Sequence, residues 1–227
     1  MTVGDSFRSV AAALSAAEAR AGRRAGETTL IAVSKRHPAS AVVEAYHAGA
    51  RDFGESYVQE MAAKREEVAQ LLGADADEIR WHFIGHLQRN KVRGLGRVHL
   101  VHTVDSLRLL HTIDARGPDV GGVLVQVNIG GEGSKAGLAP AEVGALLAGA
   151  ASRATAVQGL MTIPPRRATV DLAREDFATL RRLRDELRTE ETPLPHLSMG
   201  MSSDFEVAVA QGATLVRVGT AIFGART

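Results

Sequence analysis

Val123-Leu124-Val125-Gln126-Val127 is a short stretch of β-branched and aliphatic residues with a single polar side chain in it. Such nearly continuous apolar runs are typical of parallel strands, because helices cover both faces of a parallel sheet. Several other segments have a similar character, and short β-branched runs recur along the chain. The predicted strands are 28–35, 50–56, 80–86, 98–104, 120–129, 156–163, 196–201 and 214–223.

Helical patterns alternate with these strands. They cover 39–48, 57–72, 105–115, 141–152, 170–188 and 204–211, with a short turn near 88–92. Eight strands that alternate with helices predict an α/β protein, folded as a single (β/α)₈ TIM barrel. The chain of 227 residues is slightly short for this fold, so we expect short loops between its strands and helices. An open, doubly wound sheet is the alternative.

Residues 1–26 precede the first strand and are predicted to form one extra amphipathic helix. Phe7, Val10 and Leu14 share one face of this helix. Charged residues, among them Asp5 and Arg8, interrupt any apolar core that a signal peptide would need. Because no composition shift marks a domain boundary, we expect one domain over residues 1–227, with the barrel itself at 28–224.

Composition excludes several classes of function. The 27 basic and 26 acidic residues leave a net charge of +1, which gives no strong attraction for nucleic acid or acidic membranes. The chain has no cysteine, so disulfides, thiol catalysis and cysteine-ligated metals are excluded. No apolar run is long enough to cross a membrane. These features favour a cytoplasmic protein.

Lys35 ends the first predicted strand, and cations are unusual at the end of a buried strand. The C-terminal ends of strands carry the chemistry of α/β barrels. Partial desolvation there lowers the pKa of a lysine and frees its amine to attack a carbonyl, so Lys35 is a candidate for a Schiff base. The alternative is a surface lysine that points into water.

The segment 198–206 contains a strand end, a turn of small residues and a helix start. Ser203 and Glu206 have the spacing of a capping box, and the Ser202 hydroxyl lies beside them. The first turn of a helix offers unpaired N–H groups to an anion, so this turn is a candidate phosphate site. A helix cap without a ligand is the alternative.

The segment 215–224 is the last predicted strand and its following loop. Loops after strands seven and eight form the usual phosphate site of such barrels, and Gly219 and Thr220 lie there. Arg217 shares one strand face with Leu215 and Gly219. A buried guanidinium needs a partner, which is either the ligand or an acidic side chain on a neighbouring strand.

Together these segments describe one ligand. Lys35 can meet an aldehyde, and Ser202, Gly219 and Thr220 can meet a phosphate. Arg217 can meet a ring nitrogen between them. An aldehyde and a phosphate on opposite sides of a heteroaromatic ring describe pyridoxal 5′-phosphate (PLP).

Six motifs in this order resemble the PLP homeostasis protein family, and they extend from residue 32 to residue 224. They are Ala-Val-Ser-Lys at 32–35, Phe-Gly-Glu at 53–55, Trp-His-Phe-Ile-Gly-His-Leu-Gln-Arg-Asn-Lys at 81–91, Gly-Leu-Met at 159–161, Ser-Met-Gly-Met-Ser at 198–202 and Arg-Val-Gly-Thr-Ala-Ile-Phe-Gly at 217–224. The resemblance implies a fold-type III barrel, similar to the N-terminal domain of alanine racemase.

The resemblance also implies how PLP is held. Its aldehyde would form a Schiff base with Lys35, its phosphate would lie on Ser202, Gly219 and Thr220, and Arg217 would face the pyridine nitrogen. Members of the family are described as PLP carriers or regulators of vitamin B6 pools without an established turnover. The expected function is therefore PLP homeostasis, not catalysis. The alternatives are an amino-acid racemase-type enzyme and a Schiff-base aldolase acting on a sugar phosphate.

Three further residues complete the predicted cofactor contacts: Met201, His82 and Ser56. The family usually has Asn after Phe-Gly-Glu, where this chain has Ser56. A serine keeps one hydroxyl but loses the second arm and the reach of an amide. We therefore expect this protein to hold PLP more loosely or through water.

Arg217 also bears on the chemistry that the site can support. A guanidinium keeps its proton and so disfavours a protonated ring nitrogen beside it. The result is a weak electron sink, suited to storage, transfer or at most racemase-type proton exchange. A racemase needs a second base on the opposite face of the ring. We expect Tyr46 and Tyr57 to serve packing or to meet solvent, and no second domain to supply that base.

The remaining candidates are weaker. His82 and His86 would need helical geometry to share a metal, but their segment is predicted as a strand, so no metal site is expected. The basic residues Lys91, Arg93 and Arg97 indicate a solvated surface. Lys135 is expected on a loop after the fifth strand, with transient binding of PLP as its alternative role. The expected partners are PLP and apo-enzymes that receive it, without nucleic acid or membrane, and the chain is expected to be a monomer.

Overall fold

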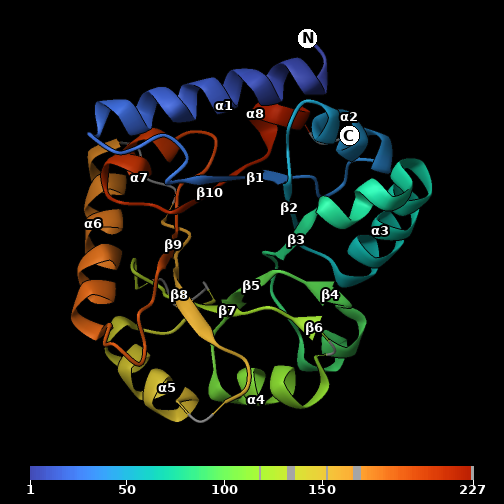
Figure 1. Ribbon diagram of the computed structural model, residues 1–227. Coiled ribbons are helices and arrows are strands. Elements are labelled where there is room, and N and C mark those ends of the chain that lie inside the picture. The colour runs from blue at the N-terminus through green and yellow to red at the C-terminus, as the bar shows by residue number, and fades with distance from the viewer. Residues whose placement is uncertain (118, 132–135, 152, 166–169, 226–227) are drawn as a thin grey trace.

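Eight parallel strands close into a barrel in the computed structural model (Figure 1). The structure describes residues 1–117, 119–131, 136–151, 153–165 and 170–225. Around the barrel the strands follow the order β1-β10-β9-β8-β7-β5-β3-β2. Their bounds are β1 Thr29–Val33, β2 Asp52–Glu55, β3 Arg80–Phe83, β5 Leu100–Val104, β7 Val123–Gln126, β8 Val157–Met161, β9 His196–Ser198 and β10 Leu215–Val218. This closure confirms the predicted barrel and excludes the open sheet.

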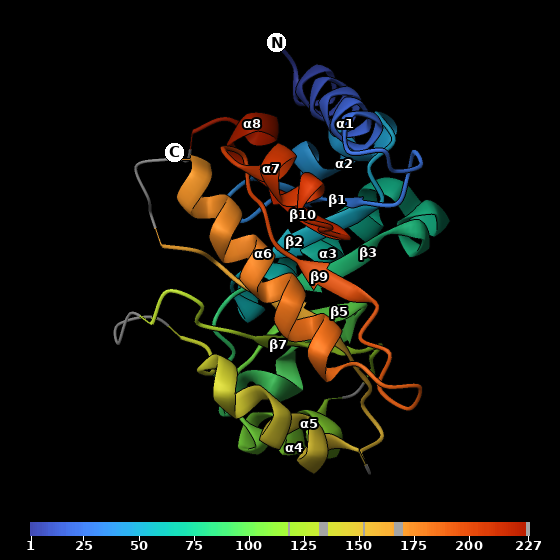
Figure 2. The ribbon, with the colours of Figure 1, turned by 90° about the vertical axis from the view of Figure 1, so that its left-hand side faces the viewer.

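Helices form an outer layer around the strands, as the two views in Figures 1 and 2 show. The α-helices are α1 Val3–Arg20, α2 Ala39–His47, α3 Val58–Leu72, α4 Leu107–Arg116, α5 Val143–Ala150, α6 Val170–Leu187, α7 Phe205–Ala210 and α8 Thr220–Phe223. Three short 3₁₀ helices accompany them: η1 Gly73–Glu78, η2 Arg89–Gly94 and η3 Pro140–Glu142. Among the described residues, no helix combines the length and the apolar character that crossing a bilayer requires.

Helix α1 lies across α2, α7 and α8, beside the seam where β1 pairs with β10 (Figure 1). Its buried face contains Phe7, Val10 and Leu14, which confirms the predicted amphipathic helix. The buried Glu18 carboxylate accepts N–H groups from Gly26 and Thr28, just before β1. The extra helix is therefore part of the barrel wall.

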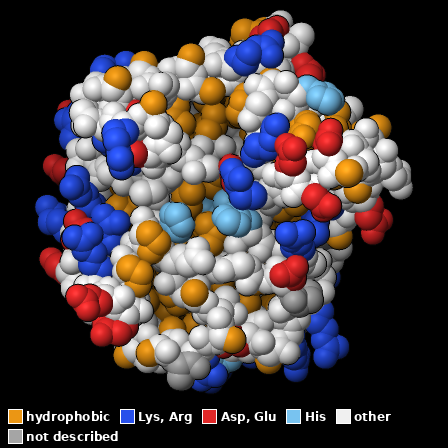
Figure 3. All heavy atoms as spheres, viewed as in Figure 1, with side chains coloured by type: hydrophobic (Ala, Val, Ile, Leu, Met, Phe, Trp, Pro, Cys, Tyr) orange, Lys and Arg blue, Asp and Glu red, His pale blue; other side chains and the backbone are white. Residues whose placement is uncertain are grey.

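The interior of the barrel follows the period of two along each strand. Ile31, Leu100, Leu124, Met161 and Leu215 meet there as a small apolar cluster. Polar side chains occupy other inward positions, and on one face of the molecule histidine and basic side chains gather near the centre (Figure 3). The interior is thus partly polar, which an ordinary packed barrel core is not.

Two predicted strands are each divided in the structure. Segments 98–104 and 120–129 lose their first residues to β4 Arg97–Val98 and β6 Asp119–Val120, which pair in a separate two-stranded sheet. The main strands resume at β5 and β7 after a break. A glycine is needed at this break, since a Cβ on Gly121 would lie 2.8 Å from the His99 carbonyl oxygen.

Two local predictions at the C-terminal end of the chain are wrong. The last strand ends at Val218, and α8 begins directly after Gly219, so 220–223 is helix. The capping box of Ser203 and Glu206 is absent, because α7 begins after Asp204. Asp204 Oδ1 instead accepts the Met201 N–H at 2.6 Å and closes the turn before the helix starts.

Candidate functional site

The ends of β9, β10, β1 and β2 are neighbours in the barrel and form one rim. Leu215 pairs with Ser198 and Ala32 with Val218, so the residues after these strands emerge at the same level. Ser202 follows β9, Gly219 and Thr220 follow β10, Lys35 follows β1 and Ser56 follows β2. The fold therefore brings the predicted contacts for the aldehyde and the phosphate to adjacent strand ends.

Lys35 is partly buried at this rim. Its Nζ donates a hydrogen bond to Ser56 Oγ at 3.2 Å, so the amine is held across the gap between β1 and β2 and does not extend into bulk water. The Gly85 backbone passes so close to Ser56 that a Cβ on Gly85 would lie 2.0 Å from the Ser56 carbonyl oxygen, so position 85 requires glycine. Beside Lys35 opens a cavity of about 510 Å³, whose lining includes Ser56, Tyr57, Ile84, His86 and Lys91.

A buried ion pair supports the strand end behind Lys35. Lys64 Nζ lies 2.6 Å from Glu55 Oε1 and 2.9 Å from Glu60 Oε1, and it donates to the Ser34 carbonyl at 2.7 Å. The Ser34 hydroxyl also donates to Glu55 at 2.7 Å. Burial raises the pKa of Glu55 although Lys64 and Ser34 favour its ionised form. These contacts fix the backbone immediately before Lys35.

Sequence reasoning missed this cluster. Two signals pointed to it: an acidic residue inside the predicted strand 50–56, and the i, i+4 pair of Glu60 and Lys64 in the following helix. Neither signal indicates that Lys64 reaches the first strand, since that contact depends on how α3 packs.

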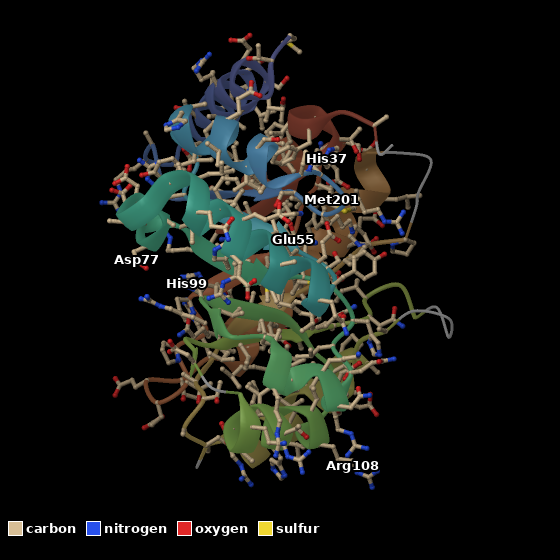
Figure 4. The ribbon with its side chains drawn as sticks, turned by 90° about the vertical axis from the view of Figure 1, so that its right-hand side faces the viewer. His37, Glu55, Asp77, His99, Arg108 and Met201 are labelled. Atoms are coloured by element: carbon tan, nitrogen blue, oxygen red, sulfur yellow. The ribbon has the colours of Figure 1, made fainter. Side chains whose placement is uncertain are left out.

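The turn after β9 requires glycine at position 200. Gly200 has φ +93°, and a Cβ there would lie 2.6 Å from the Ala208 Cβ. Met201 and the partly exposed Ser202 follow in this turn, and burial raises the pKa of Asp204, which closes it. Figure 4 shows Met201 and His37 on one side of the barrel and His99 on the other. The phosphate-side candidates thus share an end of the barrel with Lys35.

Arg217 lies inside the barrel, 4 % exposed. Its Nη1 donates to Ser198 Oγ at 2.5 Å and its Nη2 to the Thr162 carbonyl at 2.9 Å. Within the described ranges it forms no ion pair with an acidic side chain, so the alternative of a carboxylate on a neighbouring strand is wrong. Burial lowers the pKa of Arg217 to about 10, and the nearby Asp204 carboxylate opposes this shift.

His82 lies deeper than the rim, because it pairs in register with Gly54 on β2 and Leu100 on β5. Both of its ring nitrogens are engaged, with Asp52 and with His102. Its predicted contact with the cofactor stays a prediction. Lys135 lies outside the described residues.

The two tyrosines occupy different surroundings. Tyr46 is buried and donates its hydroxyl to Glu78 at 2.8 Å, while Tyr57 is 46 % exposed and accepts from Arg36 at 3.1 Å. Tyr57 does line the cavity beside Lys35. Over the described part of the chain, no group of three His, Asp or Glu side chains is arranged to hold a metal ion.

The residues at the rim fit PLP by their chemistry. A partly buried amine suits an aldehyde, hydroxyl and glycine N–H groups suit a phosphate, and a buried guanidinium with N–H donors suits an acceptor on the ring. No acidic side chain pairs with Arg217, so a carboxylate that would favour protonation of the ring nitrogen does not stand at this position in the described structure.

Comparisons with known proteins agree with this chemistry. The family model of the alanine racemase N-terminal domain matches residues 10–227. A pyridoxal phosphate homeostasis protein from Aquifex aeolicus is 43% identical, over 91% of both chains. Another, from Pseudomonas aeruginosa, is 42% identical over 99% of this chain and 96% of its own.

Solved structures show the same fold. The structure of PipY from Synechococcus elongatus with PLP bound has a TM-score of 0.83 and 36% identity, over 98% of this chain and 100% of that one. Alanine racemase from Corynebacterium glutamicum has a TM-score of 0.68 at 15% identity, over 97% of this chain and 61% of that one, so it shares the fold.

Proposed function

This chain belongs to the pyridoxal phosphate homeostasis protein family, and from that premise we propose that it binds PLP covalently on Lys35 and serves vitamin B6 homeostasis. The observation that carries the proposal is the Lys35 amine held at 3.2 Å from Ser56, at a rim it shares with Ser202, Gly219 and Thr220. The relatives carry a homeostasis name and not an enzyme name, which supports a carrier.

Each residue has one part in the proposed binding. The Lys35 amine condenses with the aldehyde carbon of PLP, forms a C=N bond and releases one water molecule. Ser202, Gly219 and Thr220 hold the phosphate, with Met201 and Ser56 beside the ligand. Arg217 faces the ring nitrogen. When bound, PLP supplies an electron-withdrawing ring, and a guanidinium facing that ring keeps it a weak electron sink.

The same proposal extends to the setting of the protein. Residues 28–224 act as one PLP-binding barrel with the helix of residues 1–26 attached, which the closure of eight strands into a single barrel supports. PLP passes from this barrel to apo-enzymes that need it. We place the protein in the cytoplasm, as a monomer.

The test is the absorption spectrum of the purified protein with PLP, repeated with Lys35→Ala and with Lys91→Ala as the matched control. Lys91 lines the same cavity but follows β3. We expect a near-visible band with the parent and with Lys91→Ala, and its loss with Lys35→Ala. Borohydride should fix PLP on Lys35, as peptide mass mapping would show. An unchanged band in Lys35→Ala contradicts the proposal.

The racemase alternative has its own measurement. Proton exchange at the α-carbon of L-alanine in deuterated water, faster than with free PLP, would indicate a racemase-type enzyme. A carrier should give no exchange above free PLP.

A further inference from the structure

A continuous chain of hydrogen bonds crosses the barrel interior beneath the rim. Asp52 Oδ1 lies 3.0 Å from His82 Nε2, and His82 Nδ1 lies 3.0 Å from His102 Nε2. His102 Nδ1 lies 2.9 Å from Ser198 Oγ, which accepts from Arg217 Nη1. These five side chains come from five different strands, β2, β3, β5, β9 and β10. All five of these side chains are buried.

The charges at its two ends fix the protons between them. Burial alone would raise the pKa of Asp52, but the hydrogen bonds from His82 and Arg80 lower it to about 2, so the carboxylate only accepts. Burial lowers the pKa of both imidazoles, that of His102 strongly, so each is neutral and carries one N–H. At the other end the guanidinium only donates.

A single arrangement satisfies every group under these conditions. His82 donates from Nε2 to Asp52, and His102 donates from Nε2 to the bare Nδ1 of His82. The bare Nδ1 of His102 then accepts the hydroxyl proton of Ser198. The Ser198 lone pairs are thereby left for Arg217. All donors point from Arg217 toward Asp52, an order in which successive hydrogen bonds strengthen one another.

Other charged groups around the chain fit this arrangement. Arg80 makes two hydrogen bonds to the Asp52 carboxylate, at 2.6 and 2.8 Å, and so holds its charge. At the upper end the Asp204 carboxylate attracts Arg217. His99 packs edge-on against His82, with ring centroids 5.2 Å apart, and His196 lies near enough to disfavour a charged imidazole. Figure 4 shows His99 on the side of the barrel away from Met201.

We propose that Asp52, His82, His102 and Ser198 are positioning residues for Arg217: the carboxylate sets both imidazole tautomers, which set the Ser198 hydroxyl, which holds the guanidinium in one orientation. Ser198 and the Thr162 carbonyl take two of the five N–H donors of Arg217. The orientation of the remaining donors is thereby fixed toward the rim. Only this last step, that they meet the ring nitrogen, rests on the proposed function.

The first experiment needs no ligand. In the full chain labelled with ¹⁵N-histidine and free of PLP, the ring-nitrogen shifts of His82 and His102 should show neutral Nε2–H tautomers from about pH 8 to below their ordinary pKa near 6.5. A charged imidazole, or an Nδ1–H tautomer at either residue, overturns the proposal. This readout does not depend on whether PLP binds Lys35.

The second experiment uses Ser198→Ala, which removes one hydroxyl from the series of hydrogen bonds between Asp52 and Arg217. The PLP-loaded protein is titrated with acid and its near-visible band is followed. The pH midpoint of the change in this band, which reports protonation of the ring nitrogen, should rise by about one unit, because a guanidinium that is no longer held in place opposes ring protonation less. Ser198→Thr, which restores a hydroxyl, should return the midpoint to the parent value. Thr28→Val is the matched control, since it removes a buried hydroxyl that bonds the Ala213 carbonyl, away from the chain.

An unchanged midpoint in Ser198→Ala, with PLP stoichiometry retained, overturns the proposal. So does an equal shift in Thr28→Val, which would point to a general effect of lost packing. If Ser198→Ala does not retain PLP, the histidine tautomers of that variant decide: the proposal requires the ring shifts of His102 to change and those of Thr28→Val to match the parent.

Discussion

At the scale of single residues, the proposed binding of PLP at Lys35 depends on the side chain beside this amine. Ser56 accepts one hydrogen bond from its amine, at 3.2 Å. The asparagine that the family resemblance leads us to expect at this position would offer a donor as well as an acceptor and would reach further. We therefore expect the proposed site in this protein to have one polar contact fewer at the rim.

Ser56→Asn should tighten PLP binding. One added hydrogen bond is worth about 1 kcal/mol, so the Kd should fall by roughly fivefold to tenfold. Titration of the near-visible band with PLP measures this, and Ser56→Ala serves as the comparison in the opposite direction. Equal Kd values for Ser56→Asn and the parent would show that position 56 does not reach the ligand.

Asp52 gives a second prediction at this scale, concerning stability and pH. Its pKa is lowered in the folded state to about 2, from 3.8, so its ionisation stabilises the fold above pH 3.8 and this contribution is lost as pH falls through 2. The contribution is about 2 kcal/mol at neutral pH, and about half of it is gone by pH 3.

The measurement is the difference in unfolding free energy between the parent and Asp52→Asn, from urea unfolding at several pH values between 7 and 3. The difference isolates Asp52, because Glu55 has a raised pKa and acts in the opposite direction in both proteins. The parent's advantage should shrink by about 1 kcal/mol on acidification to pH 3. A constant difference across this range would mean that Asp52 titrates alike in the folded and unfolded states.

The sequence was sufficient to place residues at the ends of strands. It was insufficient to identify hydrogen bonds between residues on distant strands. Lys35 and Ser202 could be singled out because their position after a predicted strand is a local property. Ser198 and His102 could not, because their bond joins β9 to β5 across 96 positions of sequence. Arg217 was placed on the correct strand face, but its partner is a serine where an acid was considered.

At the scale of elements, α3 is tied to β1 and β2 through Lys64. Its amine touches Glu55 on β2 and the Ser34 carbonyl that follows β1, both buried. Breaking a buried pair on one side leaves an uncompensated charge, which is costly, whereas removing both charges is often nearly neutral. The pair therefore fixes where α3 sits more than it adds stability.

Lys64→Met should lower the unfolding free energy by about 3 kcal/mol near neutral pH. The loss should be smaller in mild acid, because the raised pKa of Glu55 lets the orphaned carboxyl take up a proton. Urea unfolding followed by the fluorescence of Trp81, the single tryptophan, measures both. Adding Glu55→Gln should recover part of the loss, and Lys91→Met should stay within about 0.5 kcal/mol of the parent. A parent-like Lys64→Met would mean that Glu55 is already protonated.

Element boundaries show the same division between local and distant information. Strand and helix order follows from periodicity, and every barrel strand lies inside a predicted segment. The helix α8 was missed because 220–223 continues an apolar run that reads equally well as strand. The capping box failed because Asp204, one residue further on, closes the turn through Met201.

At the scale of the whole molecule, the seam between β1 and β10 is the place where the barrel closes. A regular barrel covers this seam with its last helix, but α8 has only four residues here. The N-terminal helix α1 packs against α2, α7 and α8 and takes over that part of the wall. The Arg23 guanidinium, just after α1, also donates to the Ala213 carbonyl ahead of β10.

Removal of residues 1–20 should therefore expose the seam between β1 and β10. Phe7, Val10 and Leu14 are all buried, and burying such side chains contributes about 1.5–3 kcal/mol each, so their loss costs about 5 kcal/mol or more. This is as large as the whole stability of many domains. The truncated protein should bind a hydrophobic dye and lose its cooperative urea transition. Leu14→Ala should cost about 2–5 kcal/mol in the full chain, and Ser15→Ala, on the exposed face of the same turn, less than about 0.5 kcal/mol. A truncated protein with the parent's urea midpoint would show that the strands close without α1, and that the barrel wall ends at α8.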